Sequence, residues 1–171
     1  MLKTGEMVLY GAAGACRVKE ICTKKFGDGQ EREYYVLTPL HDGRTTLYVP
    51  VDNQALHAKM RKLLSAGELE ELLLSVPREE EIWISDEKVR QETYRNTIKK
   101  ADRRELIGMT KTLYNRRKQM MAAGRKLHVA DERLYREAEK LLCDEFVVVL
   151  GLEASQVMPF ILGRLEERKE M

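Results

Sequence analysis

The chain has 171 residues, of which 34% are charged and 6% aromatic, and its formal net charge at pH 7 is +2. A chain of this length can bury a core in one or two small domains. No run of about 18 apolar residues occurs and the first residues turn polar at once, which argues against a membrane span or a secretory leader. We therefore expect a cytoplasmic protein.

Residues 1–55 show the pattern of short β-strands. Apolar and β-branched residues recur in short runs, separated by glycine or stopped by proline, at 7–10, 15–21, 34–37 and 45–49. Phe26-Gly27-Asp28-Gly29 has the composition of a hairpin turn. Several short strands at close spacing predict a small, strongly bent antiparallel sheet or SH3-like barrel over residues 1–55.

From residue 53 onward the apolar spacing becomes helical. Candidate N-caps of the helical segments are Asp52 or Asn53, Ser65, Ser85 or Asp86, Asp102 and Asp131, and Ser155 precedes a last helix expected from about residue 157. Ser65 with Glu68 has the form of a capping box. Candidate helix ends follow at Pro77, Gly124 and Gly151. We expect an α+β protein in which 56–82 connect the β domain to an all-α domain of about five helices at 83–171.

Positive charge is concentrated between Lys88 and His128. This segment holds thirteen Lys or Arg against three Asp or Glu, a net charge of +10, so the rest of the chain is negative. Such a local field favours a polyanionic partner, and Trp83, the only tryptophan, directly precedes it. Cations that engage phosphates beside an aromatic ring that engages bases are typical of nucleic-acid binders. A solvated helical face and a core tryptophan would give the same pattern.

The order of these features resembles the CarD-like (CarD/CdnL) bacterial transcription regulators, the clostridial or bacillar members most closely. The resemblance covers nearly the whole chain and rests on 5–10, 34–37, 47–51, Trp83, 101–102, 131–133 and 138–142. It implies an N-terminal, SH3- or Tudor-like domain that interacts with RNA polymerase by pairing with the lobe of the β subunit. Such pairing is strand addition, in which a partner strand satisfies the exposed backbone groups of a sheet edge.

The family's polymerase contacts fall on the second and fourth strands. In this sequence they correspond to Lys24, Lys25, Phe26, Thr46, Leu47 and Tyr48. Actinobacterial members carry a basic residue where this chain has Tyr48. A packing contact by the tyrosine is therefore expected in place of a salt bridge.

The resemblance further implies that the helical domain lies on promoter DNA at the upstream edge of the melted bubble. Trp83 would enter the minor groove there, and the alternation of residues 82–84 is expected to leave it pointing outward. The basic residues expected on phosphates are Lys88, Arg90, Lys99, Lys100, Arg103 and Arg104. Actinobacterial members have basic residues directly after the tryptophan, where this chain has Ile84, Ser85 and Asp86. Such a regulator stabilises the open promoter complex, catalyses no reaction and is expected to be a monomer.

Other functions are compatible with parts of the sequence. An enzyme is not expected, because no Ser/His/Asp arrangement, phosphate-binding loop or pair of carboxylates in an apolar setting is visible. No cofactor or metal is expected either, because the three cysteines and three histidines lack the spacing of zinc ligands, and reduced thiols are the better interpretation. The basic helices would also suit a small-barrel RNA-binding or ribosome-associated factor. A protein-interaction adaptor with an acidic partner is a third alternative.

Overall fold

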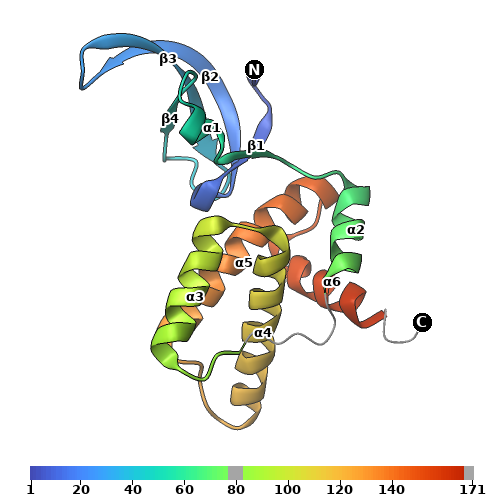
Figure 1. Ribbon diagram of the computed structural model, residues 1–171. Helices are drawn as coiled ribbons and strands as arrows, with labels where there is room; N and C mark the ends of the chain where they lie inside the picture. Colours follow the sequence, from blue (N-terminus) through green and yellow to red (C-terminus); the bar gives the residue numbers. More distant parts are fainter. Residues whose placement is uncertain (77–82, 168–171) are drawn as a thin grey trace. The chain divides into compact units, whose positions relative to one another are not determined.

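The computed structural model describes residues 1–76 and 83–167 (Figure 1). The chain divides into two compact units, residues 1–63 and 64–171. The first is built on a sheet and the second on helices, which confirms the predicted α+β class. In the described part of the predicted connecting segment, 56–76, a strand joins the sheet and a helix joins the second unit. The predicted helix end at Pro77 lies outside the described residues.

Five antiparallel strands make up the sheet of the first unit, in the order β4-β3-β2-β1-β5. Their bounds are Met7–Tyr10 (β1), Ala15–Phe26 (β2), Gln30–Pro39 (β3), Leu47–Pro50 (β4) and Met60–Lys62 (β5). A 3-10 turn, η1 (Gly11–Ala13), and a one-turn helix, α1 (Gln54–His57), connect them. Asn53, one of the two predicted candidates, is the cap of α1. The predicted strands and the hairpin turn are confirmed. Strand β5 was not predicted, because three residues are too few to show an alternating pattern.

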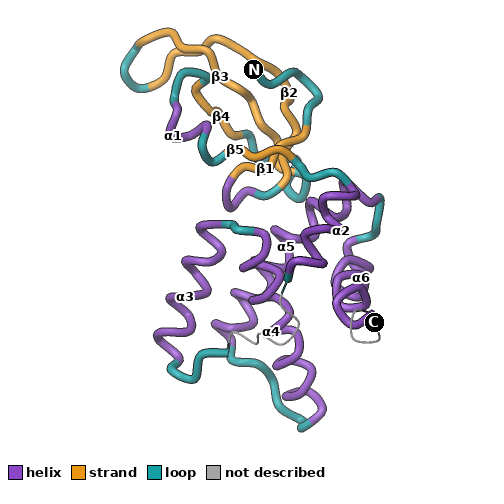
Figure 2. Tube along the Cα trace, turned by 45° about the vertical axis from the view of Figure 1, so that its right-hand side comes forward, coloured by secondary structure: helices purple, strands orange, loops and turns teal. Residues whose placement is uncertain are grey.

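The β2–β3 hairpin is the longest part of this sheet (Figure 2). Its strands pair from Cys16 opposite Pro39 to Phe26 opposite Gln30, with a register shift between Val18 and Glu20. A bulge of this kind bends a strand and increases its twist. One face of the sheet buries a small core: Val8, Cys16, Val18, Tyr35, Leu37 and Val49. Strands β4 and β5 form the two edges.

Five helices lie in the described residues of the second unit, 64–76 and 83–167. They are α2 (Ala66–Ser75), α3 (Glu87–Lys100), α4 (Arg103–Ala122), α5 (Val129–Leu150) and α6 (Ala154–Glu167). Three of the caps predicted for this unit are confirmed. Ser65 and Glu68 form a capping box. The side chains of Asp102 and of Asp86, one of the two candidates for α3, accept hydrogen bonds from the N–H groups of the third helical residues.

The cap predicted at Asp131 and the helix start predicted after Ser155 are wrong. Helix α5 begins at Val129, and its N-cap is His128, whose Nδ1 accepts a hydrogen bond from the N–H of Ala130. Asp131 is the third residue inside the helix and is buried. The helix dipole favours a carboxylate in the first turn, so an aspartate is common both at the N-cap and inside the first turn. Helix α6 begins at Ala154, so Ser155 is its second residue instead of preceding it.

Helices α3, α4 and α5 pack side by side around a shared apolar core (Figures 1 and 2). A two-residue turn at Ala101, which has a left-handed conformation with φ of 54°, reverses the chain between α3 and α4. The start of α3 and the end of α4 therefore lie at the same end of the unit. Within residues 1–76 and 83–167 no single helix is long and apolar enough to cross a membrane; only α5 and α6, bent by 90° at their junction, reach that length and composition as a pair.

Candidate functional site

The two strand segments predicted as a polymerase-binding surface meet on one side of the sheet. Phe26, Tyr34 and Tyr48 form an aromatic patch, in which the ring centroid of Phe26 lies 5.0 Å from that of Tyr34 and 5.2 Å from that of Tyr48. Tyr34 is buried, whereas Phe26 and Tyr48 are 44% and 37% exposed. Two exposed rings resting on a buried one form a surface suited to protein contact.

A lysine adds a positive charge to this patch. The Nζ of Lys24 donates a hydrogen bond to the hydroxyl of Tyr48 at 3.1 Å and lies 4.6 Å from the centre of its ring. The hydrogen bond to Tyr48 raises the pKa of Lys24. Strand β2 thus supplies a cation directly beside Tyr48.

The other predicted polymerase contacts are placed differently. Lys25 alternates to the opposite side of β2 from Lys24 and forms an ion pair with Glu31 at 3.4 Å. Leu47 is partly buried against the sheet core, and Thr46 is exposed just before β4. Because β4 is an edge strand, one row of its backbone N–H and C=O groups faces away from the sheet. Thr46, Leu47 and Tyr48 therefore lie on or next to an edge that can accept a further strand, and Lys24 and Phe26 reach Tyr48 from β2, across β3.

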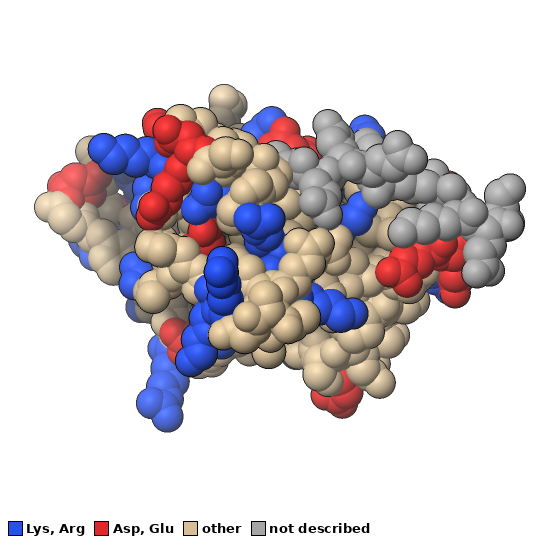
Figure 3. Space-filling view, turned by 90° about the horizontal axis from the view of Figure 1, so that it is seen from below, with Lys and Arg blue, Asp and Glu red and all other residues tan. Residues whose placement is uncertain are grey.

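The predicted DNA contacts of the helical unit lie at opposite ends of α3. Trp83, Lys88 and Arg90 are at its start, and Lys99 and Lys100 are in its last turn. From residue 88 to residue 99 a helix rises about 16 Å, so a single contact point cannot include both groups. Figure 3 shows Lys and Arg side chains spread over the end of the helical unit where α3 begins and α4 ends.

The cations at the far end of α3 are mostly held by protein groups. Arg103 makes a bidentate pair with the buried Glu145, with N–O distances of 2.7 and 2.9 Å. Arg104 donates to the carbonyl oxygen of Ser75, and Lys100 pairs with Glu105, both at 2.8 Å. These contacts stabilise the helix packing, and Lys99 remains as an exposed cation there.

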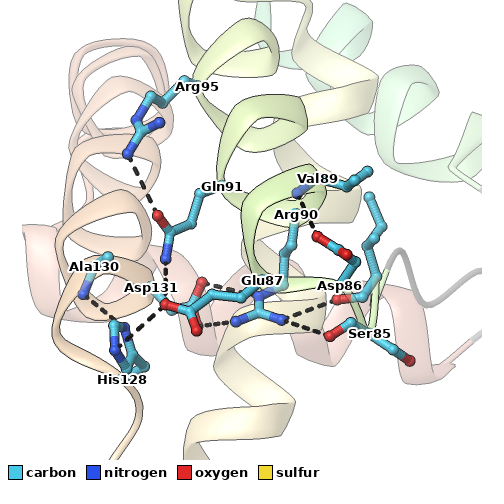
Figure 4. Close-up of polar contacts among 11 residues, drawn as sticks. Ser85, Asp86, Glu87, Val89, Arg90, Gln91, Arg95, His128, Ala130 and Asp131 are labelled. Atoms are coloured by element: carbon cyan, nitrogen blue, oxygen red, sulfur yellow. Dashed lines mark hydrogen bonds and ion pairs between the residues drawn. The ribbon is translucent and has the colours of Figure 1, made fainter.

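Arg90 does not occupy the phosphate-binding position that the resemblance implies, because its side chain is buried at the start of α3. Its Nε and Nη2 donate to the two carboxylate oxygens of Asp131 at 3.0 and 2.8 Å (Figure 4), and the side chains are 7% and 1% exposed. Its Nη1 donates to the carbonyl oxygen of Ile84 at 3.0 Å. The pairing with Asp131 raises the pKa of Arg90 further. The guanidinium thus ties α3 to α5 and to the segment that carries Trp83.

Trp83 lies between this buried pair and a second arginine. The indole is half-buried against the helical core instead of pointing fully outward as predicted. The guanidinium carbon of Arg90 is 4.3 Å from the ring centre, and that of Arg116 on α4 is 4.5 Å from it. Both distances are in the range of cation–π attraction. The contact with Arg116 had no sequence signal, because it exists only through the antiparallel packing of α3 and α4.

Comparison with known proteins identifies the first unit. Residues 2–64 match the family model of the CarD-like/TRCF RID domain, a span that corresponds to the sheet-containing unit and ends where the helical unit begins. No curated protein matches the chain. Domains of this family interact with RNA polymerase and are in general non-catalytic. This match supports the resemblance noted in the sequence: residues 2–64 form a domain of the CarD-like/TRCF RID family, whose members interact with RNA polymerase.

Proposed function

We propose that this protein regulates transcription by binding the lobe of the RNA polymerase β subunit and stabilising the open promoter complex. The observation that carries the proposal is a tryptophan held in place by a buried ion pair at a basic end of the helical unit, in a chain with a polymerase-interacting domain. The protein would act in the cytoplasm as a monomer bound to the polymerase.

On the polymerase side, the edge of β4 accepts a strand of the β lobe. Backbone hydrogen bonds supply part of the affinity of such an interface, and side chains next to the edge set its specificity. Phe26 and Tyr48 offer exposed apolar area for packing. Actinobacterial members carry a basic residue at the position of Tyr48. In this chain Lys24, on another strand of the sheet, supplies a positive charge at the same place.

On the DNA side, the indole of Trp83 stabilises a distorted, partly unstacked step at the minor groove. Because the ring is already held by Arg90 and the helical core, little of the binding free energy is lost in ordering it. Lys88, exposed in the first turn of α3, is placed to approach a phosphate. A tenfold preference for melted over closed DNA would shift promoter opening by about 1.4 kcal/mol and no more.

The test is the lifetime of open complexes formed by purified polymerase holoenzyme with added protein. Trp83→Ala should keep the helical fold, measured by circular dichroism, and lose the effect on lifetime. Val89→Ala removes another apolar side chain, 50% exposed at the same end of α3, and should behave like the wild type. An unchanged lifetime with Trp83→Ala, or loss of the fold, would count against the wedge.

Structured RNA offers a second discriminating measurement. Tight, salt-dependent binding of such RNA without polymerase would favour the alternative of an RNA-binding factor. Weak nucleic-acid binding by the protein alone, with a strong effect only in the presence of holoenzyme, agrees with the regulator proposed above.

A further inference from the structure

Between residues 84 and 90, directly after the tryptophan, only one exposed cation can reach DNA. The three residues after Trp83 are Ile84, Ser85 and Asp86, none of them basic. Of the next two basic residues, Lys88 is exposed, but Arg90 is buried and directed at Asp131. A side chain inserted in the minor groove lies between two phosphate backbones. A single nearby lysine leaves most of the negative charge of these phosphates unmatched.

The packing of α4 against α3 brings another cation to this place. Arg116 lies with its guanidinium carbon 4.5 Å from the centre of the Trp83 ring, and its side chain is exposed. We propose that Arg116 is a DNA-contacting residue, which binds a backbone phosphate beside the step that the indole enters. This inference rests on the proposed DNA-binding role of Trp83.

The neighbours of Arg116 on α4 are less suitable. Arg117 forms an ion pair with Glu132 at 3.3 Å and lies over the ring of Tyr135. Lys118 is exposed, but it is two residues further along and therefore about 200° around the helix from Arg116. Among residues 1–76 and 83–167, no acidic side chain forms an ion pair with Arg116. Its charge is therefore not matched by that part of the protein.

The two arginines at the indole thus have different tasks. Arg90 is fixed by two hydrogen bonds to a buried carboxylate and positions the ring. Arg116 is held by the ring face, and a phosphate offers it a stronger, charge-assisted and bidentate contact. When DNA arrives, Arg116 exchanges the ring face for phosphate while Arg90 keeps the indole in place.

The experiment titrates the full-length protein into preformed holoenzyme–promoter complexes at several salt concentrations. The apparent affinity is read from the increase in open-complex lifetime. Arg116→Ala should weaken the affinity roughly 3- to 10-fold and reduce the slope of log affinity against log salt by about 1, the value for one phosphate contact. Arg116→Lys should keep the slope. Lys118→Ala, which removes the same charge from another side of α4, should leave the slope close to the wild-type value.

Equal effects of Arg116→Ala and Lys118→Ala on affinity and slope would overturn the inference. If the two alanine variants behave alike while Trp83→Ala abolishes the lifetime effect in the same assay, only the role of Arg116 is refuted. If Trp83→Ala has no effect, the proposed function itself fails, whatever Arg116→Ala does. Melting followed by circular dichroism checks that each variant is folded, and a loss of affinity by Arg116→Ala that only accompanies unfolding also refutes the inference.

Discussion

Replacing Asp131 by alanine should destabilise the helical unit more than any surface substitution. Among the described residues, its carboxylate is the one that forms an ion pair with the buried guanidinium of Arg90, and it accepts two hydrogen bonds from it. Removing it leaves a positive charge in the interior, among packed apolar side chains. Arginine cannot escape this cost by losing its proton, because pairing or burial does not bring its pKa near neutrality.

The magnitude follows from the burial of the pair. Breaking an ion pair that is buried on both sides costs about 3–5 kcal/mol, because the remaining charge is neither solvated nor matched. Native domains are stable by only about 5–15 kcal/mol. With a urea m-value of about 2 kcal/mol per M, the unfolding midpoint should fall by roughly 2 M.

The assay is urea unfolding followed by tryptophan fluorescence. Trp83 is the only tryptophan and lies in the helical unit beside the pair, so the signal reports this unit alone. The matched control is Glu105→Gln, which breaks the exposed pair with Lys100 and should cost about 0–1 kcal/mol. A loss for Asp131→Ala no larger than that of the control would refute the buried-pair argument.

A double substitution separates the cost of the unpaired buried charge from the cost of lost packing. Replacing Arg90 and Asp131 together by Met and Leu removes both charges and keeps apolar volume, so the cost should be much smaller than for Asp131→Ala alone. The double variant should nevertheless lose the effect on open complexes, because the indole then lacks the guanidinium that holds it. A double variant as unstable as the single one would show that packing, not the unpaired charge, dominates.

Three further predictions concern other parts of the chain. Tyr48→Glu should weaken capture by an isolated β-lobe fragment in a pull-down, because it places a carboxylate in the aromatic patch; equal capture would contradict the assigned surface. Ser65→Ala should lower stability in urea by about 1 kcal/mol. The backbone N–H of Ser65, and after it the Ser65 side chain, lower the pKa of Glu68, and this stabilisation is present above the unfolded-state pKa of Glu68 and is lost as pH falls through the lower folded value. Ser65→Ala removes only the side-chain contribution, so only that part of the deficit should disappear in acid. Thiol labelling at neutral pH should modify Cys22 first, since the other two cysteines are buried and burial raises the pKa of Cys143 to about 12; three equally fast thiols would contradict the fold.

Local features of this protein could be predicted from the sequence because their causes are local. The hairpin at 26–29, the capping box at Ser65 and the caps at Asp86 and Asp102 each depend on residues within a few positions of one another. The positive charge of the segment from Lys88 to His128 likewise follows from composition alone, and the polyanionic partner that it favours stays a prediction. The exception at Asp131 has the same origin, since an acidic residue near a helix start does not reveal whether it is the cap or lies inside the first turn.

The tertiary structure alone decided which charged and aromatic residues work together. Arg90 and Lys88 are both basic and lie in the same turn, yet one is buried against a carboxylate of α5 and the other is exposed. Arg116 reaches Trp83 only because α3 and α4 pack antiparallel, and Lys24 reaches Tyr48 only across an intervening strand. Net charge and periodicity describe a segment by itself, whereas the partner of a side chain depends on which segments the folded core brings within a few ångströms of it.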